Sequence, residues 1–498
     1  MQFIEPWAVI AAMAIYGVII GSIGVYAYKV SERRSLEDFF LMGRLLGPVV
    51  GAFTMVYTLL SGFTFFGMAG LAYITGLGEP VMFSALVIMF TILLFVFGPK
   101  LWYLSKLYRY ITPGDYLDDR LQSKFTRVLA TIIFLIYMVF ALAAQMEAVG
   151  AAFTAMTGGA LPYWSGCVAL AILLIILAAI GGFRGVVWTD FIQGVFILGM
   201  LWVALFWLLV SMGGPAKAFG AIAATEPIYL QLPGPFNFYS PTAWFSLTCM
   251  YTIYMWVHPS MMQRIFALRN PRSLRLFAAL ICVVTIATVL PVGLIGVLGR
   301  LHFRFAPFSP QCDEVFPLLV LKLLPPWFAL LIICGAMAAI VTTADSFILT
   351  TSSLLIKDCW LAFRPQISEA KAVLASRLLI VLLTIIAYLI SLPRGLIIAA
   401  MKGLADTFLT AGLVAPIGLA LYLKRINKVG AIAGMLAGVI VNTALTIGPA
   451  EFNVFAQLPP LQTYPVVYGL IASAVVTLIL SYLTKPVPRE TLKRHLLE

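Results

Sequence analysis

The sequence predicts an all-α polytopic membrane protein with about 13 transmembrane helices, each near the ~20 residues needed to cross a bilayer. Of its 498 residues, 62% are hydrophobic and only 10% are charged, whereas a soluble protein carries roughly 25% charged residues. Apolar segments follow one another along the whole chain, and lysine and arginine gather in every second loop between them.

The apolar segments define the elements in order. They lie near residues 7–27, 48–76, 80–98, 128–156, 161–181, 186–212, 242–262, 277–299, 327–356, 372–392, 397–422, 429–448 and 463–484. The first lacks a basic leader and an obvious small-residue cleavage site, so we interpret it as a retained span. The longer connections 213–241 and 300–326 contain apolar and aromatic residues, from which short surface helices could form.

The loop charges predict the orientation. With the N-terminus outside, 26 lysine and arginine residues fall on the inner side and six on the outer side. This split follows the positive-inside rule, and a miscount by one helix would scramble it. We therefore expect a multi-pass protein of the plasma (inner) membrane, with its N-terminus outside and its C-terminus in the cytoplasm.

Several function classes are excluded. The net charge of +12 does not indicate nucleic-acid binding, because the basic residues sit in short loops of a lipid-embedded chain. There is no GxSxG, HExxH, Walker A or Rossmann fingerprint, so no enzyme is expected. No nucleotide-binding domain fits in the loops, so an ion gradient must drive any transport. We expect the bilayer and a small organic solute as partners, with no obligate protein partner.

The second span is rich in glycine and hydroxyl residues. Residues 47–70 read GPVVGAFTMVYTLLSGFTFFGMAG, with Thr58, Ser61 and Thr64 in the middle. Glycine and serine clustered at mid-membrane favour an unwound helix, whose free carbonyls can bind a cation. Close helix packing by glycine is the alternative reading of the same pattern.

The seventh span contains a proline that predicts a second break. Pro259 removes a helical hydrogen bond and disfavours helix at His258. His258 is then either a substrate or proton ligand, or a neutral histidine hydrogen-bonded at the break. Arg264 is expected near the inner end of this span, as a charge that sets topology.

The ninth span carries a stripe of small and hydroxyl residues on one helical face. Its members are Ala339, Thr342, Thr343, Ser346, Thr350 and Ser353. Such a face suits either a hard cation or close helix packing. Asp345 lies in the same span, and Glu147 lies in the fourth. A charge inside the membrane costs at least ~2.5–3.5 kcal/mol, so each needs a partner or a role.

Helix counting predicts two inverted repeats. Spans 2–6 (45–212) and spans 7–11 (242–422) each contain an odd number of helices and each open with a broken helix, as in many secondary transporters. An extra helix (1–30) precedes them and two helices (429–484) follow them in a single transporter domain. Lys402 and Asp406 are four residues apart in span 11, a spacing that permits an ion pair.

Four runs of residues resemble the sodium/solute symporter family. They are SLEDFFLMGRLLGPVVGAF, IGGFRGVVWTDFIQG, HPSMMQRIFALRN and AAIVTTADSFILTTSSLLIKD, which together span residues 35–358. The resemblance implies a LeuT-like core of ten helices in a 5+5 inverted repeat, with sodium as the co-transported ion.

The resemblance also implies a sodium site. Its carbonyl ligands match Tyr57 and Leu60 on the broken helix, and its carbonyl and hydroxyl ligands match Ala339, Thr342 and Thr343. Asp190, in the WTD run, is associated with sodium binding in the family. Some relatives carry an acidic residue where Leu59 stands here, so an additional charge at that position is not expected.

Within the family, the HP dipeptide and the run FPLLVLKLLPPWFALLIICGAMAAI resemble pantothenate and monocarboxylate transporters. A small organic anion is therefore the expected substrate. The candidate contacts are Ser61, Thr64, Gln145, Tyr254, His258 and Lys402. A proton-coupled carrier that titrates Glu147, His258 or Asp345, a sodium symporter for an amino acid or other neutral solute, and a channel or sensor remain the alternatives.

Overall fold

The computed structural model describes residues 3–30, 35–393, 405–447 and 465–496. Within these ranges the chain forms helices and no β-strand. Ten helices there are long and apolar enough to cross a membrane, or eleven if one bent pair counts as a single span. The multi-pass character is therefore confirmed, whereas the number of thirteen spans stays a prediction.

The first part of the chain forms a bundle with one broken span. Its helices are α1 (Pro6–Val30), α2 (Leu36–Leu41), α3 (Pro48–Leu59), a π-helix (Phe63–Met68), α4 (Ala69–Thr75), α5 (Gly78–Tyr108), α6 (Pro113–Leu121), α7 (Lys124–Met156) and α8 (Tyr163–Ser211). The predicted spans 161–181 and 186–212 run together in α8. They meet at a kink at Gly182, where φ is +58° and a Cβ atom would lie 2.8 Å from the Phe39 ring.

The second part repeats the pattern with another interrupted span. Its helices are α9 (Pro215–Thr225), α10 (Pro241–Tyr251), α11 (Pro259–Ala267), α12 (Pro271–Leu298), α13 (Val315–Leu323), α14 (Pro326–Leu354), α15 (Glu369–Ser391), a helix over Ala405–Tyr422 that ends in α17 (Ala415–Tyr422), α18 (Lys428–Ile447), α19 (Pro465–Leu483) and α20 (Arg489–Leu496). The expected short helices in the longer connections are present as α9 and α13.

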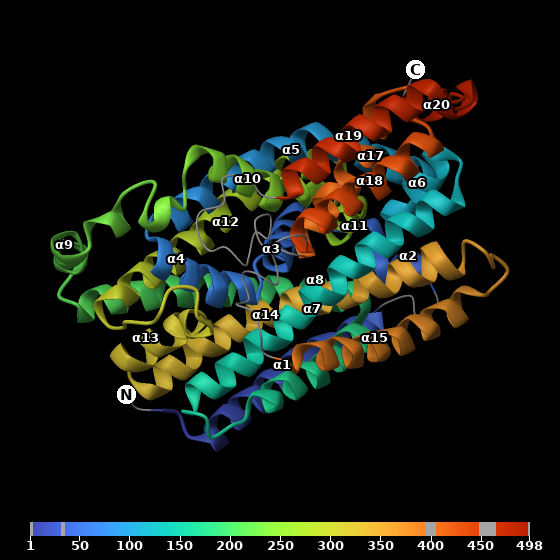
Figure 1. The fold of residues 1–498 in the computed structure, drawn as a ribbon. Helices are drawn as coiled ribbons and strands as arrows, with labels where there is room; N and C mark the ends of the chain where they lie inside the picture. Colours follow the sequence, from blue (N-terminus) through green and yellow to red (C-terminus); the bar gives the residue numbers. More distant parts are fainter. Residues whose placement is uncertain (1–2, 31–34, 394–404, 448–464, 497–498) are drawn as a thin grey trace.

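Helix α14 lies at the centre of the bundle and packs against α8, α7 and α3. Its residues 335–354 are all buried, so its hydroxyl stripe faces protein rather than lipid. The beginning of α1 lies at the same end of the bundle as α9 and α13, while α6 and α20 lie at the other end (Figure 1). The start of α1 and the helix α20 thus lie at opposite ends of the bundle.

Both predicted helix breaks are present. The α3 helix and the segment that follows from Phe63 are bent by 64°, and Leu60 between them has an extended backbone with φ −84° and ψ 92°. In the other span α10 ends at Tyr251, His258 is non-helical, and α11 begins at Pro259. A proline suits the first position of a helix because it lacks the N–H that would be unpaired there.

Candidate cation and substrate sites

The first break brings backbone carbonyls to two hydroxyl groups of α14. Thr342 Oγ1 lies 2.9 Å from the Tyr57 carbonyl oxygen, and Thr343 Oγ1 lies 3.1 Å from the same oxygen and 3.5 Å from that of Leu60. Both hydroxyls also approach the Ala339 carbonyl, at 2.8 and 3.2 Å. The structure therefore brings together five of the six residues that the family resemblance implies for sodium, and Asp190 is not among them.

This cluster has more oxygen lone pairs than hydrogens. The two hydroxyl groups supply one hydrogen each, yet they make five short contacts to carbonyl oxygens. A small cation among these oxygens would satisfy the lone pairs that lack a donor. The chemistry of the set, carbonyl and hydroxyl oxygens at an unwound helix, suits sodium.

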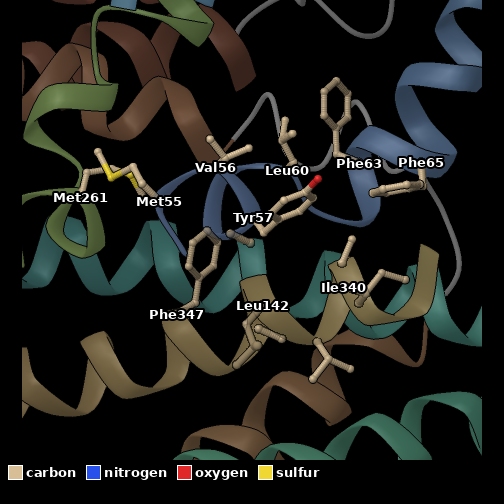
Figure 2. Packing of buried hydrophobic residues seen from close by; sticks show 14 of the residues in the cluster. Met55, Val56, Tyr57, Leu60, Phe63, Phe65, Leu142, Met261, Ile340 and Phe347 are labelled. Carbon is tan, nitrogen blue, oxygen red and sulfur yellow. The ribbon is translucent and has the colours of Figure 1, made fainter. Parts of the chain in front are cut away.

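The local structure explains why these carbonyls are available. The last four carbonyl groups of a helix have no partner within it, and α3 ends at Leu59. Figure 2 shows Tyr57 and Leu60 on this helix end, beside the segment of α14 that carries Ile340 and Phe347. The break thus turns ordinary backbone groups into candidate ligands.

The second half of the first broken span is held by capping contacts. Gln145 Oε1 accepts a hydrogen bond of 2.8 Å from the Gly62 amide, and its Nε2 donates to the Ala141 carbonyl. Ser61 Oγ accepts from the Phe63 amide at 3.2 Å. Two predicted substrate contacts, Gln145 and Ser61, are therefore occupied in stabilising the break, next to buried Thr64.

The second break is lined by ring side chains. His258 is fully buried, and its Nε2 lies 3.0 Å from the Tyr137 hydroxyl. Tyr254 approaches the rings of both residues and interacts with Asp406 on the helix Ala405–Tyr422. The structure therefore brings Tyr254, His258, Tyr137 and Asp406 together, and the role of Tyr254 and His258 as substrate contacts stays a prediction.

Arg264 differs from its expected role. It is fully buried within the bundle, so the prediction that it is only a topology charge is wrong. Its guanidinium donates to Thr54 Oγ1 at 2.9 Å, to Ser346 Oγ at 2.7 Å and to Asp190 Oδ2 at 3.3 Å. A buried arginine with an acidic partner escapes the penalty of an unpaired charge.

Asp190 belongs to this arginine cluster. Its Oδ2 accepts a hydrogen bond of 2.5 Å from Thr54 Oγ1 in addition to the contact with Arg264. Its hydrogen bonds within the described chain thus lie in the arginine cluster rather than among the carbonyl oxygens, and its role as a sodium ligand stays a prediction. Asp345 is equally buried, and neither of its carboxylate oxygens has a hydrogen bond among the described residues.

The remainder of the hydroxyl stripe joins α14 to α11. Thr350 Oγ1 lies 3.0 Å from Ser260 Oγ and donates to Gln263 Oε1 at 2.9 Å. Ser353 Oγ accepts a 2.6 Å hydrogen bond from Gln263. Helix packing thus accounts for this part of the stripe, whereas Ala339, Thr342 and Thr343 face the first break.

Sequence reasoning missed several residues of these clusters. Thr54 lies one turn before Tyr57 on α3, and Tyr137 lies two turns before Gln145 on α7, so both spacings were visible in the sequence. Lys402, which is predicted as a substrate contact and as the ion-pair partner of Asp406, lies outside the described residues. Among the described residues no three His, Cys, Asp or Glu side chains form a metal-binding group.

Comparison with known proteins agrees with this architecture. A family model described as "Sodium:solute symporter family" matches residues 39–438, which is well over half of the chain. The chain belongs to this family. The family resemblance of the four sequence runs is therefore confirmed, and this symporter is a sodium-coupled membrane transporter rather than an enzyme.

Individual relatives cover nearly the whole length of this symporter. It is 28% identical to the sodium/pantothenate symporter of Escherichia coli (strain K12), over 97% of this chain and 98% of the relative. It is 26% identical to the osmoregulated proline transporter OpuE of Bacillus subtilis (strain 168), over 96% and 95%.

Solved structures share the fold of this symporter. The structure of a Na⁺-coupled sialic acid symporter superposes with a TM-score of 0.80 at 19% identity, covering 98% of this chain and 100% of that one. MhsT in complex with L-phenylalanine gives a TM-score of 0.53 at 10% identity, over 88% and 98%. At these identities the likeness concerns the fold alone.

Proposed function

We propose that this symporter uses one sodium ion, bound between α3 and α14, to drive uptake of a small organic anion by alternating access. The observation that carries the sodium site is the convergence of Thr342 and Thr343 on the Tyr57 carbonyl. An ion held by both helices would fix the broken helix against the centre of the bundle. Release of the ion would free that helix to move.

The membrane topology is part of this proposal. Thirteen spans, with the N-terminus outside and the C-terminus in the cytoplasm, fit the 26-to-6 charge split, and they fit helices α1 and α20, since α1 begins at the end of the bundle opposite to α20. The two inverted repeats, 45–212 and 242–422, would each begin with one of the two broken spans. Their pseudosymmetry would put both breaks at mid-membrane.

The energetics support accumulation of solute. One cation that enters across ~100 mV gains about 2.3 kcal/mol, which corresponds to roughly a 50-fold gradient of a neutral solute. One sodium ion and one monovalent anion that move together carry no net charge across the membrane. The sodium concentration gradient would then supply the driving force. The number of sodium ions that move with each substrate molecule therefore decides whether the membrane potential contributes to the driving force.

For the substrate we propose a monocarboxylate or pantothenate-like anion. The support is a relative named as a sodium/pantothenate symporter and the helix start at Phe63, where the positive end of the helix dipole favours negative charge. Thr64, Tyr254 and His258 would contact the rest of the molecule. Lys402, predicted from the sequence, would supply a positive charge.

An amino acid is the second candidate substrate. The observation that favours it is the carboxylate of Asp406 beside Tyr254, since a buried acid would attract an ammonium group and repel an anion. A relative named as a proline transporter agrees with this candidate. Uptake of radiolabelled pantothenate, short monocarboxylates and proline into proteoliposomes would decide between the two.

The sodium site is tested by removing its hydroxyl oxygens. We expect Thr342→Ala together with Thr343→Ala to raise the sodium concentration for half-maximal uptake at least about tenfold, because a contact to a charged group contributes about 1.5–3 kcal/mol. Thr343→Ser keeps the oxygen and should behave like the wild type. Thr351→Ala is the matched control, because Thr351 donates to Phe347 within α14. An unchanged sodium dependence in the double variant, or uptake that follows pH and ignores sodium, would overturn the proposal.

A further inference from the structure

A groove on the outer surface of the bundle lies between α1 and the second half of α8. It has a volume of about 400 Å³ and is lined by Ser22, Ile23, Tyr26 and Ala27 of α1 and by Trp188 and Ile192 of α8. Exposed apolar side chains of the two helices, as on a surface that faces lipid, include Val18, Ile19, Val25 and Val195. None of the lining residues belongs to the candidate sodium or substrate contacts, so neither site accounts for this groove.

Small residues bring α1 and α8 together beside the groove. A Cβ atom at Gly181 would lie 3.3 Å from the Gly24 Cα, so the two backbones lie close to each other. Ala27 is buried, whereas Tyr26 and Trp188 are exposed. Small residues allow membrane helices to approach closely. The groove therefore follows a close helix contact and has larger side chains of both helices along it.

Most of the lining offers only hydrocarbon to a ligand. Ile23, Ala27 and Ile192 are apolar, and the Ser22 hydroxyl donates its hydrogen to the Ile19 carbonyl at 2.6 Å within α1. A polar group placed here would lose its hydrogen bonds to water without gaining a donor. An acyl chain of a lipid meets this condition, and each of its methylene groups gains by burial.

Aromatic and basic residues follow the apolar lining at one end of the groove. On α1, Lys29 lies three residues after Tyr26 on the same helical face. On α8, Ile192, Trp188 and Arg184 are spaced by four residues, which also places them on one face. Both helices thus present apolar, then aromatic, then basic side chains.

The two basic residues lie at the same end of the groove. A Cβ atom at Gly185 would lie 3.7 Å from the Ala27 Cβ. Arg184 directly precedes Gly185, and Lys29 follows Ala27 by two residues, so both lie near this point. A phospholipid has the same order of groups, from acyl chain to glycerol esters to phosphate. Tyrosine and tryptophan are favoured at the level of lipid headgroups.

The charges at this end suit a phosphate group. Arg184 Nη2 donates to Asp38 Oδ1 at 2.6 Å, and the guanidinium side chain is 19% exposed against 6% for the carboxylate. A guanidinium carries five N–H donors, so the contact with Asp38 leaves donors for another acceptor. Lys29 is exposed and adds a further positive charge. Together these three residues carry a net positive charge.

We propose that the groove between α1 and α8 binds one anionic phospholipid, with an acyl chain in the groove and the phosphate held by Lys29 and Arg184. The lipid would fasten the extra helix α1 to α8. In the topology proposed above, it comes from the cytoplasmic leaflet, whose surface attracts basic residues.

The groove lies on the opposite face of the helix turn that carries Asp190. Asp190 stands between Trp188 and Ile192 in the sequence, yet it is fully buried and contacts Arg264. A lipid against Trp188 and Ile192 would therefore support the turn of α8 that holds the arginine cluster. This gives the bound lipid a route to the stability of the transporter.

Native mass spectrometry tests lipid binding without measuring transport, so its outcome does not depend on the sodium proposal. The delipidated full-length protein is titrated with palmitoyl-oleoyl-phosphatidylglycerol or with palmitoyl-oleoyl-phosphatidylethanolamine, which has the same acyl chains and no net charge. We expect the first molecule of the anionic lipid to bind about fivefold more tightly or better, since a basic residue near the surface contributes about 1 kcal/mol.

Two variants separate the headgroup contact from the acyl groove. Lys29→Gln should lose most of the preference for the anionic lipid, whereas Lys428→Gln removes an exposed charge of another helix and should keep it. Ser22→Trp places a large ring in the groove and should weaken the binding of both lipids.

Ile15→Trp is the matched control for Ser22→Trp, because Ile15 is exposed on α1 outside the groove. Equal binding of both lipids by the wild type would overturn the proposal. So would unchanged binding in Ser22→Trp, because the lipid would then sit elsewhere on the bundle. Thermal unfolding of each variant shows that it is folded, and Lys29→Gln tests the site even where Ser22→Trp is unstable.

Discussion

The two broken spans differ in what fills the gap. In the α3–α4 span the gap is short, and backbone carbonyls meet the hydroxyl groups of Thr342 and Thr343. In the α10–α11 span the gap covers residues 252–258 and is packed with rings, including Trp256, which stacks on Phe97 at 3.9 Å. The first break is thus lined by backbone carbonyl and hydroxyl oxygens, and the second by ring side chains.

The difference has a physical origin in how each helix is interrupted. At the first break Gly62 permits a close approach, because a Cβ atom there would lie 2.6 Å from the Ala148 Cβ. At the second break Pro259 lacks the backbone N–H that would continue a helix from the residues before it. Those residues are therefore not held in one α-helix, and they carry large side chains. Glycine therefore allows a tight backbone approach at the first break, whereas the second break is lined by the side chains of the residues before the proline.

Arg264 is the link between the two broken spans, and its loss has the largest expected effect. It reaches from α11 to Thr54 on α3 and to Asp190 on α8. Arg264→Met leaves Asp190 buried without its cation, which should cost about 3–5 kcal/mol of stability and abolish uptake. Thermal unfolding in detergent and sodium-driven uptake measure the two effects.

A double variant provides the control for Arg264. Asp190→Asn combined with Arg264→Met removes both charges, so it should recover a large part of the lost stability even if transport stays low. A single Arg264→Met variant with wild-type stability would show that the two breaks are not coupled through this arginine.

The tight packing of the first break gives the next prediction. Gly62→Ala should cost about 1–3 kcal/mol through overpacking against Ala148 and weaken sodium dependence by displacing the Leu60 carbonyl. Ala148→Gly in the same chain should restore both properties. Gly47→Ala is the matched control in the same span, because a Cβ atom at Gly47 meets nothing within 4 Å. A Gly62→Ala protein with normal sodium dependence would contradict the comparison of the two breaks.

Some residues of these two sites could be predicted from the sequence, and others could not. Pro259 predicts the second helix break from the sequence alone, because a proline acts on the backbone next to it. Thr342 and Thr343 could be assigned by their helical face and by resemblance to the family. Their actual contacts with Tyr57 depend on the tertiary fold, which no local pattern contains.

The role of Arg264 could not be predicted from the sequence. A charged residue near the predicted end of a span is ordinarily a topology signal, and its real partners, Thr54, Asp190 and Ser346, come from three different helices. Gln145 was likewise assigned to the substrate, whereas it caps the Gly62 amide. Such networks form between distant segments, so periodicity cannot reveal them.

The Gln145 cap tests whether the first break depends on a side chain from another helix. Gln145→Met removes the acceptor for the Gly62 amide and should cost about 1–3 kcal/mol, because a buried N–H is left unpaired. Sodium dependence should weaken with it. Thermal unfolding and sodium titration of uptake measure both, and unchanged values would show that the amide finds another acceptor.

The smallest expected effect is that of a substitution at the second break. It should change the KM for the organic solute rather than the dependence on sodium. Tyr137→Phe removes the hydroxyl that lies 3.0 Å from His258 Nε2, a loss of about 1 kcal/mol. If this gap holds the organic solute, the KM for that solute should change severalfold while the sodium concentration for half-maximal uptake stays the same. Tyr422→Phe is the control, because its hydroxyl contacts Val96 at the bundle surface. A change in sodium dependence without a change in KM would reverse the roles assigned to the two breaks, since the ring-lined gap would then act on the ion.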